Sequence, residues 1–472
     1  MQDERRPERW FLPLLIATTA VFKLVLAWCS PGFLTGDDVE IVETAAKFAV
    51  GLDYTPWAIR SLFHPLVFAL PFVKAGAIAG LASARWLAFL ATLPGVLASS
   101  VAIGLVHRLA RDLGCGEGAA RGAALLYAVH WLPLAYGSTA YPRPISTALL
   151  VGAFLLVWHS RGRTGLASAA GALAACAFAV RWSEGLFLAP LAAVAWWKDR
   201  RPSSLFALAG GFAAGTVLAV GVFDALTWGA PFASLAAFLR YAREVGLEGS
   251  HPWHWYGWSA FRWLGPAWPV LLVLGWPDRR SRLPLSVAAG MLALLSFSAF
   301  KELRYLQIVI PFLSIAAALG SERLRAGAGW RKGLAAIVLA GAVAWGLERT
   351  LALMNGKSRP AVEAALYLHS LAPPVSIVAL EQQWAFGDRL ILGNGVRIRG
   401  ITPDRPLRPS SVEAAASGAD ALALYERGVS PEIAGLLEQR GLVPCARFQW
   451  RGSKVVGVYV PANRPCPAVP AP

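Results

Sequence analysis

The chain has 472 residues, 56% of them hydrophobic and 15% charged, with a mean hydropathy of +0.51 and a formal net charge of +16. A soluble domain carries roughly 25% charged residues, and a disordered chain combines low hydrophobicity with high charge, so both classes are excluded for most of the length. Apolar stretches of membrane-spanning length recur from Trp10 to Leu353, which predicts an α-helical polytopic membrane protein. Positive loops on one membrane face explain the net charge better than a nucleic-acid partner does, and we expect no such partner.

The N-terminal sequence MQDERRPERW precedes an apolar run, as in a signal peptide, but no clear small-residue cleavage site follows it. We therefore interpret it as a retained first helix. Apolar composition predicts about eleven crossings, at roughly 10–29, 86–107, 119–136, 144–159, 165–180, 184–197, 204–226, 261–276, 284–300, 304–320 and 333–352.

A further apolar stretch, at 62–81, decides the topology. Counting it as a crossing would place basic loops such as HRLARDLG and WKDRRPSS outside, against the positive-inside rule. If it lies in or on the outer interface instead, the inner segments hold 18 Lys and Arg in about 51 residues, and the outer segments hold 10 in about 104. We therefore predict a multi-pass protein of an inner, plasma or ER-like membrane, with a cytoplasmic N-terminus and an exported C-terminus.

The composition changes near Asn355. Alternating stretches such as VSIVAL and KVVGVYV predict strands, and SPEIAGLLEQRG is typical of a helix. We predict a multi-span domain at 1–354, with outer loops 31–85 and 224–260, and a small exported α/β domain at 355–472 that ends in an unstructured Pro-rich tail. On the exported side, where disulfides persist, Cys445 and Cys466 fit either a bridge or two free thiols.

The first predicted outer loop is rich in carboxylates: Asp37, Asp38, Glu40 and Glu43. A carboxylate at a membrane surface can act as general base on a sugar hydroxyl. A single acidic residue in a loop is more often a solvated or helix-capping group. Trp57 and Arg60 follow in the same loop, and this aromatic and basic continuation favours a binding site.

Arginines stand at the outer ends of two predicted spans. Arg143 lies in YGSTAYPRPIS, and Arg181 lies in RWSE, three residues before Glu184. Either guanidinium could hold a lipid-linked phosphate through bidentate hydrogen bonds. The alternatives are an interfacial arginine or an internal Arg181–Glu184 pair.

The long predicted outer segment begins near Asp224 and ends in an aromatic and histidine-rich stretch that includes His251, Trp253 and His254. One interpretation is an aromatic belt at the membrane interface, and the other is a loop that contacts a sugar or a lipid phosphate. The two histidines lack a nearby third ligand, so we do not expect a metal site.

The sequence FKELRYLQIVIPF places Lys301, Glu302 and Arg304 between two apolar runs. The two cations suit a phosphate or diphosphate, and the alternative is a tight outer turn whose charges reach the lipid headgroups. Because the chain contains no P-loop, no GxGxxG in a Rossmann context and no GxSxG, nucleotide-driven chemistry is not supported. Together the motifs predict one outer-face cavity with carboxylates and phosphate-binding cations.

Three segments resemble the integral-membrane mannosyltransferases of glycosyltransferase family 22, which have the GT-C fold. The order of Asp37-Asp38, Glu43, Gly51, Trp57 and Arg60-Ser61 is similar to the family's first outer loop. Asp224 and His251-Pro252-Trp253-His254-Trp255 reproduce its large loop, and Phe300-Lys301-Glu302-Leu303-Arg304 its third signature. The resemblance covers about 10–350. Asp38 stands where the family usually has Glu, and Phe300 where it has His.

The resemblance implies an inverting glycosyltransferase without a nucleotide or other cofactor. Its donor would be a polyprenyl-phosphate sugar, with mannose as the first expectation, and its acceptor a glycan or glycolipid in contact with membrane lipid. Asp37 or Asp38 would deprotonate the acceptor hydroxyl, and Lys301 and Arg304, or Arg181, would neutralise the leaving lipid phosphate. We expect no essential divalent metal.

Two other classes remain open from the sequence. Another GT-C enzyme, such as one that adds aminoarabinose to a lipid, would share the acidic outer loop and the lipid-phosphate donor. A transporter or flippase would need polar residues near the middle of the membrane, and Lys23 and His130 are the few candidates. No internal repeat is visible, which disfavours a repeat-built transporter.

Overall fold

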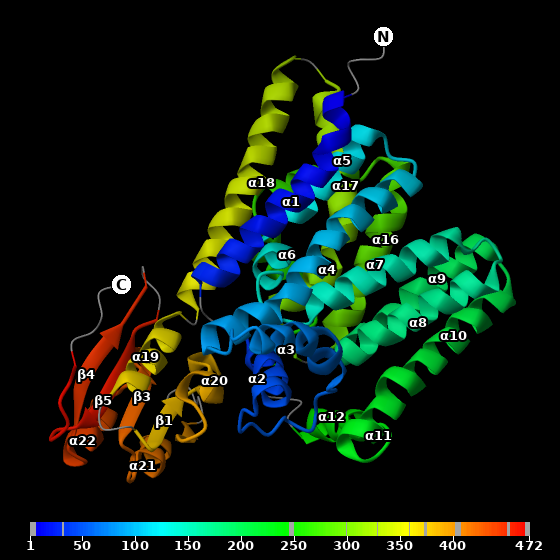
Figure 1. Ribbon diagram of the computed structural model, residues 1–472. Helices are drawn as coiled ribbons and strands as arrows, with labels where there is room; N and C mark the ends of the chain where they lie inside the picture. The colour runs from blue at the N-terminus through cyan, green and yellow to red at the C-terminus, as the bar shows by residue number, and fades with distance from the viewer. Residues whose placement is uncertain are drawn as a thin grey trace. The chain divides into compact units, whose positions relative to one another are not determined.

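The computed structural model describes residues 6–30, 33–244, 250–298, 300–327, 329–357, 359–371, 375–401, 407–450 and 454–467. Its contacts divide the chain into two compact units (Figure 1). The first unit comprises Met1–Val25, Trp57–Phe68 and Leu93–Thr350, and the second comprises Leu26–Pro56, Ala69–Thr92 and Leu351–Pro472. The predicted first outer loop is therefore shared between the two units, and most of it groups with the C-terminal region. The predicted boundary at residue 355 stays a prediction.

The first unit is helical. Its α-helices are α1 (Arg6–Cys29), α4 (Ala84–Asp112), α5 (Glu117–Val129), α6 (Trp131–Tyr136), α7 (Arg143–Ser160), α8 (Thr164–Val180), α9 (Leu188–Asp199), α10 (Pro202–Thr216), α11 (Phe223–Trp228), α12 (Ala233–Glu244), α13 (Trp255–Trp258), α14 (Ala260–Leu264), α15 (Ala267–Gly275), α16 (Arg282–Phe297), α17 (Ile310–Arg325) and α18 (Gly329–Gly356), the first, second and last of which extend past its limits. Two short π-helices are η1 (His64–Ala69) and η3 (Val217–Val222). Three short 3-10 helices are η2 (Trp182–Phe187), η4 (Arg279–Ser281) and η5 (Leu303–Ile308).

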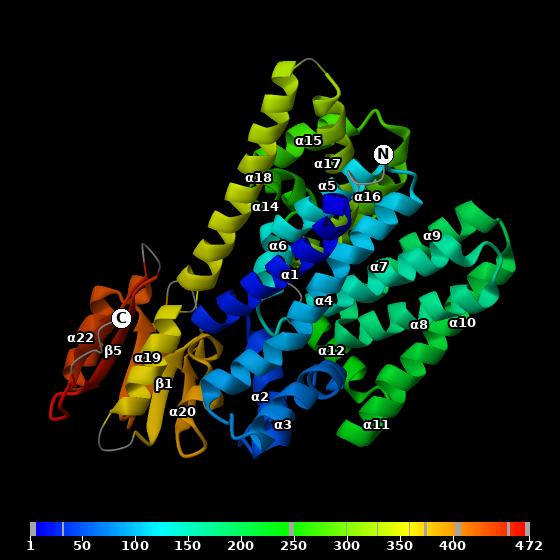
Figure 2. The same ribbon diagram turned by 45° about the horizontal axis from the view of Figure 1, so that its top comes forward.

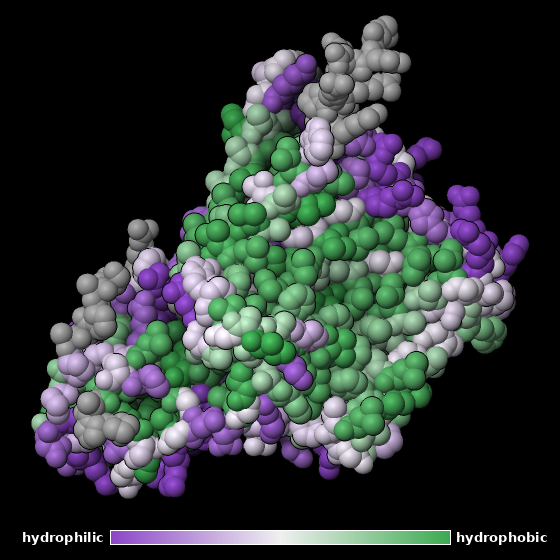
Figure 3. Space-filling model, in the orientation of Figure 1, coloured by the Kyte–Doolittle hydropathy of each residue, from purple (hydrophilic) through white to green (hydrophobic). Residues whose placement is uncertain are grey.

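Five helical segments among the described residues are long and apolar enough to cross a membrane. They are Trp10–Cys29, Ala84–Asp112, Arg143–Ser160, Pro202–Trp228 and Gly329–Ser370, and each coincides with a predicted crossing. Apolar side chains cover much of the helical surface in Figure 3, and hydrophilic ones gather at helix ends on its upper right. The chain is thus an integral, multi-pass membrane protein, while its orientation and the number of about eleven crossings stay predictions.

The other predicted crossings coincide with shorter or interrupted helices, and two of the interruptions have a clear local cause. His130 has an extended backbone and caps α6 through its Nδ1, so 119–136 is split into α5 and α6. Gly265, with φ +76°, separates α14 from α15. The apolar helical segment His64–Ile78 would be about 22 Å long, which is less than the roughly 30 Å hydrocarbon core. The placement of 62–81 outside the set of full crossings stays a prediction.

Glycine permits very close helix packing in the first unit, and α8 and α10 lie side by side in both ribbon views (Figures 1 and 2). A Cβ at Gly171 would collide with the carbonyl of Leu208, and one at Gly211 would collide with the carbonyl of Ser168. Small residues on both helices let the backbones approach in this way, which is a common means of association in membranes.

The second unit combines helices with one sheet. Its helices are α2 (Gly36–Val50), α3 (Leu70–Ile78), α19 (Arg359–Ser370), α20 (Asp388–Leu392), α21 (Pro409–Ala416) and α22 (Pro431–Gln439), with the 3-10 turns η6 (Gln383–Phe386) and η7 (Glu426–Gly428). Its strands are β1 (Ile377–Glu381), β2 (Arg397–Ile401), β3 (Ala421–Tyr425), β4 (Leu442–Phe448) and β5 (Val456–Pro461). The strands predicted in VSIVAL and KVVGVYV correspond to β1 and β5.

The sheet has the order β2-β1-β3-β5-β4, with β1 parallel to β2 and β3, and β5 antiparallel to β3 and β4. Alternate side chains of a strand point to opposite faces. Leu380 therefore packs in a cluster with Phe386 and with Leu368 of α19, whereas Ala379 packs with Val412 of α21 and residues of α22. The sheet is covered on both faces, which suits its central parallel strands.

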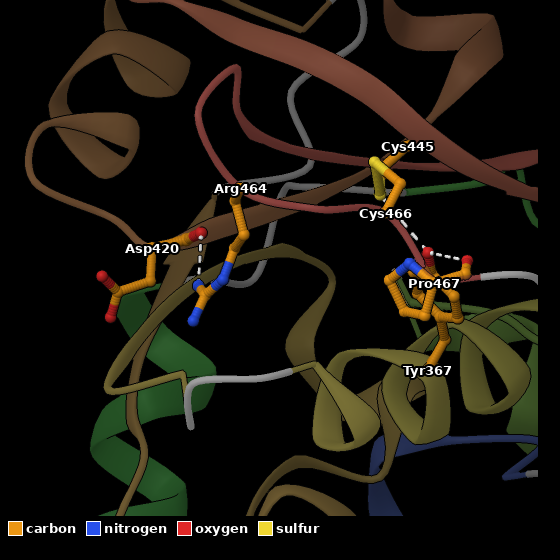
Figure 4. Close-up of a disulfide and its surroundings, with 6 residues drawn as sticks. All are labelled: Tyr367, Asp420, Cys445, Arg464, Cys466 and Pro467. Carbon is orange, nitrogen blue, oxygen red and sulfur yellow. Dashed lines mark hydrogen bonds between the residues drawn. A yellow bond between two sulfur atoms is a disulfide. The ribbon is translucent and has the colours of Figure 1, made fainter.

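A disulfide ties the C-terminal segment to β4. Cys445 and Cys466 are bonded, with their Cα atoms 5.5 Å apart, so the structure selects the bridge over two free thiols. Figure 4 shows Tyr367 beside it, whose hydroxyl donates to the carbonyl of Pro467 at 2.8 Å. Arg464 donates to the carbonyl of Asp420 at 3.2 Å.

Candidate active site

The two aspartates predicted as candidate bases lie in the first turn of α2 and have different surroundings. The Asp38 backbone N–H donates to Oγ1 of Thr35 at 3.2 Å, while Oδ2 of Asp38 accepts from the N–H groups of Thr35 at 3.0 Å and Leu34 at 2.8 Å. This reciprocal pattern is a capping box, which satisfies backbone donors at a helix start. Asp37 and Asp38 are both buried, but only Asp38 belongs to that capping box.

Glu43 lies about one and a half turns further along α2, is 1% exposed, and is hydrogen-bonded to the C-terminal region. Its Oε1 accepts from the backbone N–H of Leu390, in α20, at 2.9 Å. Burial, followed by the charge of Asp388, raises the pKa of Glu43 well above its ordinary value of 4.5. Glu43 therefore holds α20 in place, and Glu40, which is also buried, lies one turn before it.

Three arginines surround two tyrosines in the first unit. The guanidinium carbons of Arg143, Arg181 and Arg304 lie 4.6, 5.1 and 5.8 Å from the centre of the Tyr305 ring. Those of Arg181 and Arg304 are each 5.3 Å from the centre of the Tyr141 ring. Cations favour the faces of aromatic rings, so the two tyrosines gather positive charge contributed by three separate chain segments. We call these five residues the arginine–tyrosine cluster.

Within this cluster Arg143 is the anchored member. It is fully buried, and it donates to the carbonyl of Tyr305 at 2.9 Å and to Oγ of Ser183 at 3.0 Å. Its Nη1 is also 3.2 Å from Oε1 of Glu184, which accepts from Oγ of Ser146 at 3.1 Å. These contacts place Arg143 in a supporting position, with its guanidinium fixed against η2 and η5.

The other two guanidinium groups are half-buried. Arg304 forms an ion pair with Glu302, and Arg181 immediately precedes η2. The three arginines and the two carboxylates, Glu184 and Glu302, sum to a formal charge of +1. An anion is therefore the ligand that the local charge favours, and Arg side chains keep their charge at all physiological pH values.

Lys301, predicted as a phosphate ligand, is buried and engaged by the backbone. Its Nζ donates to the carbonyl of His251 at 2.8 Å and to the carbonyl of Ser298. Next to it Phe300 forms an isolated β-bridge with Ser250. These bonds join the segment after α16 to the start of the aromatic stretch, so the geometry gives Lys301 a role in fixing the loop.

Asp224, at the start of the long predicted outer segment, is also held by hydrogen bonds within the protein. Its Oδ2 accepts from the N–H of Ser234 at 2.9 Å and from Oγ of the same residue at 2.6 Å. Ser234 lies in the first turn of α12, so Asp224 satisfies donors at that helix start. The carboxylate thereby fixes the turn between α11 and α12.

The aromatic stretch itself is mostly exposed. The His251 ring stacks on Trp255 at 4.4 Å, and His254 meets the edge of Trp253 at 5.5 Å. Trp253 is 73% exposed, as suits an aromatic residue at a membrane interface. Among the described residues no group of three or more His, Cys, Asp or Glu side chains is placed to hold a metal ion.

Trp57 and Arg60 belong to the first unit. The Trp57 ring packs edge-on against Tyr241 of α12 at 5.1 Å, and the Arg60 guanidinium lies 5.7 Å from the centre of the Trp57 ring. Because 46% of Trp57 is exposed, it presents an aromatic face outside the core.

The predicted site residues therefore fall into two sets. The acidic set of α2 is in the second unit, and the cations and aromatic residues are in the first. Sequence reasoning did not single out Tyr141 and Tyr305, although both adjoin residues that it did consider: Tyr141 is two residues before Arg143, and Tyr305 follows Arg304 directly. All three arginines lie near the Tyr305 ring, and two of them also lie near the Tyr141 ring.

Several solved structures are similar to this chain at low sequence identity. ArnT from Cupriavidus metallidurans, in complex with undecaprenyl phosphate, matches with a TM-score of 0.62 and 15% identity, covering 94% of this chain and 97% of that one. The Archaeoglobus fulgidus oligosaccharyltransferase, tethered to an acceptor peptide, matches with a TM-score of 0.54 and 12% identity over 98% of this chain and 75% of that one. The arabinofuranosyltransferase AftD from Mycobacteria matches with a TM-score of 0.53 and 17% identity over 96% of this chain and 40% of that one.

These similarities define the fold as that of the GT-C membrane glycosyltransferases. The sequence itself matches one family within this fold class, over residues 20–381. The chain belongs to the Alg9-like mannosyltransferase family. The predicted resemblance to glycosyltransferase family 22 is confirmed, and the protein is an integral membrane glycosyltransferase.

Proposed function

We propose that the protein transfers mannose from a polyprenyl-phosphate donor to a hydroxyl of a lipid-linked glycan or other glycan on the exported side of the membrane. The observation that carries this proposal is the arginine–tyrosine cluster, whose net positive charge suits a lipid phosphate. The family supports the choice of mannose, and the undecaprenyl phosphate bound by the similar ArnT supports the choice of donor.

The reaction is a single displacement at the anomeric carbon. The acceptor oxygen forms a bond to that carbon from the face opposite the phosphate, and the carbon–oxygen bond to the phosphate breaks, which inverts the configuration. The proton of the acceptor hydroxyl passes to a carboxylate of α2, and the electron pair of the broken bond leaves with polyprenyl phosphate. Arg181 and Arg304 stabilise the growing negative charge on the leaving phosphate, with no nucleotide or essential metal.

Asp37 is the stronger candidate for the base. Oδ2 of Asp38 already accepts two backbone hydrogen bonds at the start of α2, and those bonds stabilise its charged form and restrict its orientation. Asp37 is its immediate neighbour and is not a member of the capping box. The proposal therefore assigns proton transfer to Asp37 and the fixing of the helix start to Asp38.

The test is transfer of radiolabelled mannose from polyprenyl-phosphate mannose by membranes containing wild-type protein, Asp37→Asn or Asp38→Asn. A general base contributes about 10²- to 10⁴-fold, so Asp37→Asn should lose at least 10²-fold in kcat with an unchanged unfolding temperature. Asp38→Asn keeps an accepting oxygen for the cap and should retain most of the rate. The assignment is wrong if Asp38→Asn is the inactive variant and Asp37→Asn is not.

A second candidate is a GT-C transferase for another sugar, such as an aminoarabinose-type enzyme. It is favoured by the extent of the match to ArnT, which covers most of both chains. Transfer from another polyprenyl-phosphate sugar but not from the mannose donor would select it. Absence of transfer from every lipid-phosphate donor by folded protein would instead favour a transporter or flippase.

A further inference from the structure

The second unit contains a polar cavity whose lining includes none of the predicted site residues. Its volume is about 380 Å³, within the range of roughly 300–1,000 Å³ that small-ligand pockets occupy. Its lining consists of Asp53, Tyr54, Thr55, Gln383, Asp388, Arg389 and Ile398. Two segments that are more than 300 residues apart in the sequence form its walls, and both belong to the same compact unit.

The first wall is the segment after α2. Asn394 clamps it from the C-terminal region, because Oδ1 of Asn394 accepts from the N–H of Asp53 at 2.8 Å and its Nδ2 donates to the carbonyl of Gly51 at 3.4 Å. Nζ of Lys47, in the last turn of α2, donates to the carbonyl of Tyr54 at 2.7 Å. The backbone at 51–54 is thus held at three points, and its side chains line a cavity of fixed shape.

The second wall is the start of α20. Asp388 has φ +37°, directly after Gly387 at φ +75°, so a residue with a Cβ occupies the left-handed region there. Such a conformation costs on the order of 1–3 kcal/mol and persists where the surroundings impose it. The surroundings include the bond from Nε2 of Gln383 to Oδ2 of Asp388, 3.3 Å long, and the bond from the N–H of Leu390 to Glu43.

The lining chemistry selects one class of ligand. The lining side chains carry hydroxyl, amide, carboxyl and guanidinium groups, and Ile398 is the one aliphatic side chain among them. An apolar ligand would therefore leave polar groups unsatisfied. A phosphate is disfavoured as well, because two carboxyl groups face one guanidinium, and Nη1 of Arg389 already donates to the carbonyl of Val396. A neutral molecule with many hydroxyl groups can hydrogen-bond to these polar groups without bringing a negative charge close to the carboxyl groups. The Tyr54 ring adds a flat apolar surface against which such a molecule can pack.

We infer that this cavity binds a sugar of the acceptor glycan, and the inference rests on the proposed transferase function. The same helix, α2, carries Asp37 and Glu43, and the latter adjoins the cavity wall through Leu390. Asp37 and Glu43 are six residues apart, or about 9 Å along the helix axis. The cavity is therefore offset from the candidate base and holds a sugar other than the one that is glycosylated, which makes an oligosaccharide the preferred acceptor.

The first experiment measures binding without a donor. Full-length protein in nanodiscs is titrated with linear mannotriose by saturation-transfer NMR, with inorganic phosphate as competitor. We expect mannotriose to bind, phosphate not to displace it, and Asp53→Asn and Gln383→Ala each to weaken binding roughly tenfold, as loss of one hydrogen bond implies. The matched controls Glu438→Gln and Gln439→Ala, exposed on α22 and outside the lining, should bind as wild type does.

The second experiment measures transfer to mannotriose and to methyl α-mannoside from polyprenyl-phosphate mannose. Asp53→Asn and Gln383→Ala should raise the KM for mannotriose more than that for the monosaccharide. Equal KM changes for both acceptors, unchanged mannotriose binding in both variants, or displacement by phosphate would overturn the inference. If wild type binds mannotriose through these residues but transfers no sugar from any lipid donor, the transferase proposal fails while the sugar site stands.

Discussion

Glu43 and Leu390 are joined by a hydrogen bond of 2.9 Å across 347 residues of sequence. The bond connects α2, which follows the first predicted crossing, with α20, which precedes β2 of the C-terminal sheet. Trp384 also lies against Gly36 at the start of α2, with 3.7 Å from its Cγ to the Cβ that a larger residue would have there. The helix that carries the candidate base is thus supported by the C-terminal region, and deleting that region would remove this support.

Burial of Glu43, followed by the charge of Asp388, predicts a pH-dependent stability. The folded state raises the pKa of Glu43 above 4.5, so it binds a proton more tightly than the unfolded chain does. The contribution of this proton to the free energy of unfolding is fully present below pH 4.5. It is lost as pH rises through the folded-state pKa, at up to about 1.4 kcal/mol per pH unit. Glu43→Gln keeps an accepting oxygen and removes the titration, so its unfolding temperature should fall less steeply with pH.

Thermal unfolding in nanodiscs between pH 4.5 and 8 measures this slope. Glu438→Gln, exposed on α22, is the matched control and should follow wild type. Burial also raises the pKa of Asp388, so some slope should persist in Glu43→Gln. Identical slopes in Glu43→Gln and wild type would contradict the assignment.

The buried pair of Arg143 and Glu184 predicts a strong dependence on both partners. Removing one member leaves the other charge buried and unpaired, which costs about 3–5 kcal/mol. Arg143→Met and Glu184→Leu should each destabilise by that amount, and the double variant by much less than the sum. The exposed pair of Arg440 and Glu413 is the control, where each single change should cost about 0–1 kcal/mol. Additive losses at the buried pair, measured by unfolding free energies in detergent, would show that the two side chains do not interact.

Five of the predicted crossings coincide with long apolar helices because such helices depend on local information. Uninterrupted apolar runs such as Trp10–Cys29 are recognised from hydropathy alone, and a cation between two such runs is expected at a membrane edge. Helix breaks were harder to predict. The one at His130 depends on a side chain that accepts a backbone hydrogen bond inside an apolar stretch, which hydropathy does not register.

The partners of individual side chains could not be predicted in the same way. Arg143 and Tyr305 are 162 residues apart, so nothing local indicates that the Tyr305 carbonyl accepts from Arg143. Lys301 has the composition of a phosphate ligand, yet its Nζ donates to two backbone carbonyls. Its predicted contact with the donor stays a prediction.

The disulfide between Cys445 and Cys466 leads to one prediction about the stability of the second unit and one about the side of the membrane on which the C-terminal region lies. It closes a loop of 21 residues, which corresponds to about 3 kcal/mol from the lost entropy of the unfolded chain. Cys445→Ser with Cys466→Ser should therefore lower the unfolding free energy of the second unit by roughly that amount. In a background lacking Cys29, Cys115 and Cys176, a membrane-impermeant maleimide should label intact cells only after reduction. Labelling without reduction, or only after permeabilisation, would contradict an exported, bridged C-terminal region.

Removal of divalent metal should leave transfer unchanged within about twofold, because Arg181 and Arg304 can supply the positive charge that a leaving monophosphate requires. The same reasoning makes the arginine–tyrosine cluster indispensable. Arg304→Gln removes a charged hydrogen-bond donor worth about 1.5–3 kcal/mol and should raise the donor KM roughly 10- to 150-fold. Initial rates against donor concentration, with and without EDTA, measure both effects, and Arg240→Gln, exposed on α12, is the control for loss of one positive charge. Abolition of wild-type transfer by EDTA and its rescue by Mn²⁺ or Mg²⁺ would assign the phosphate to a metal ion instead of the arginines.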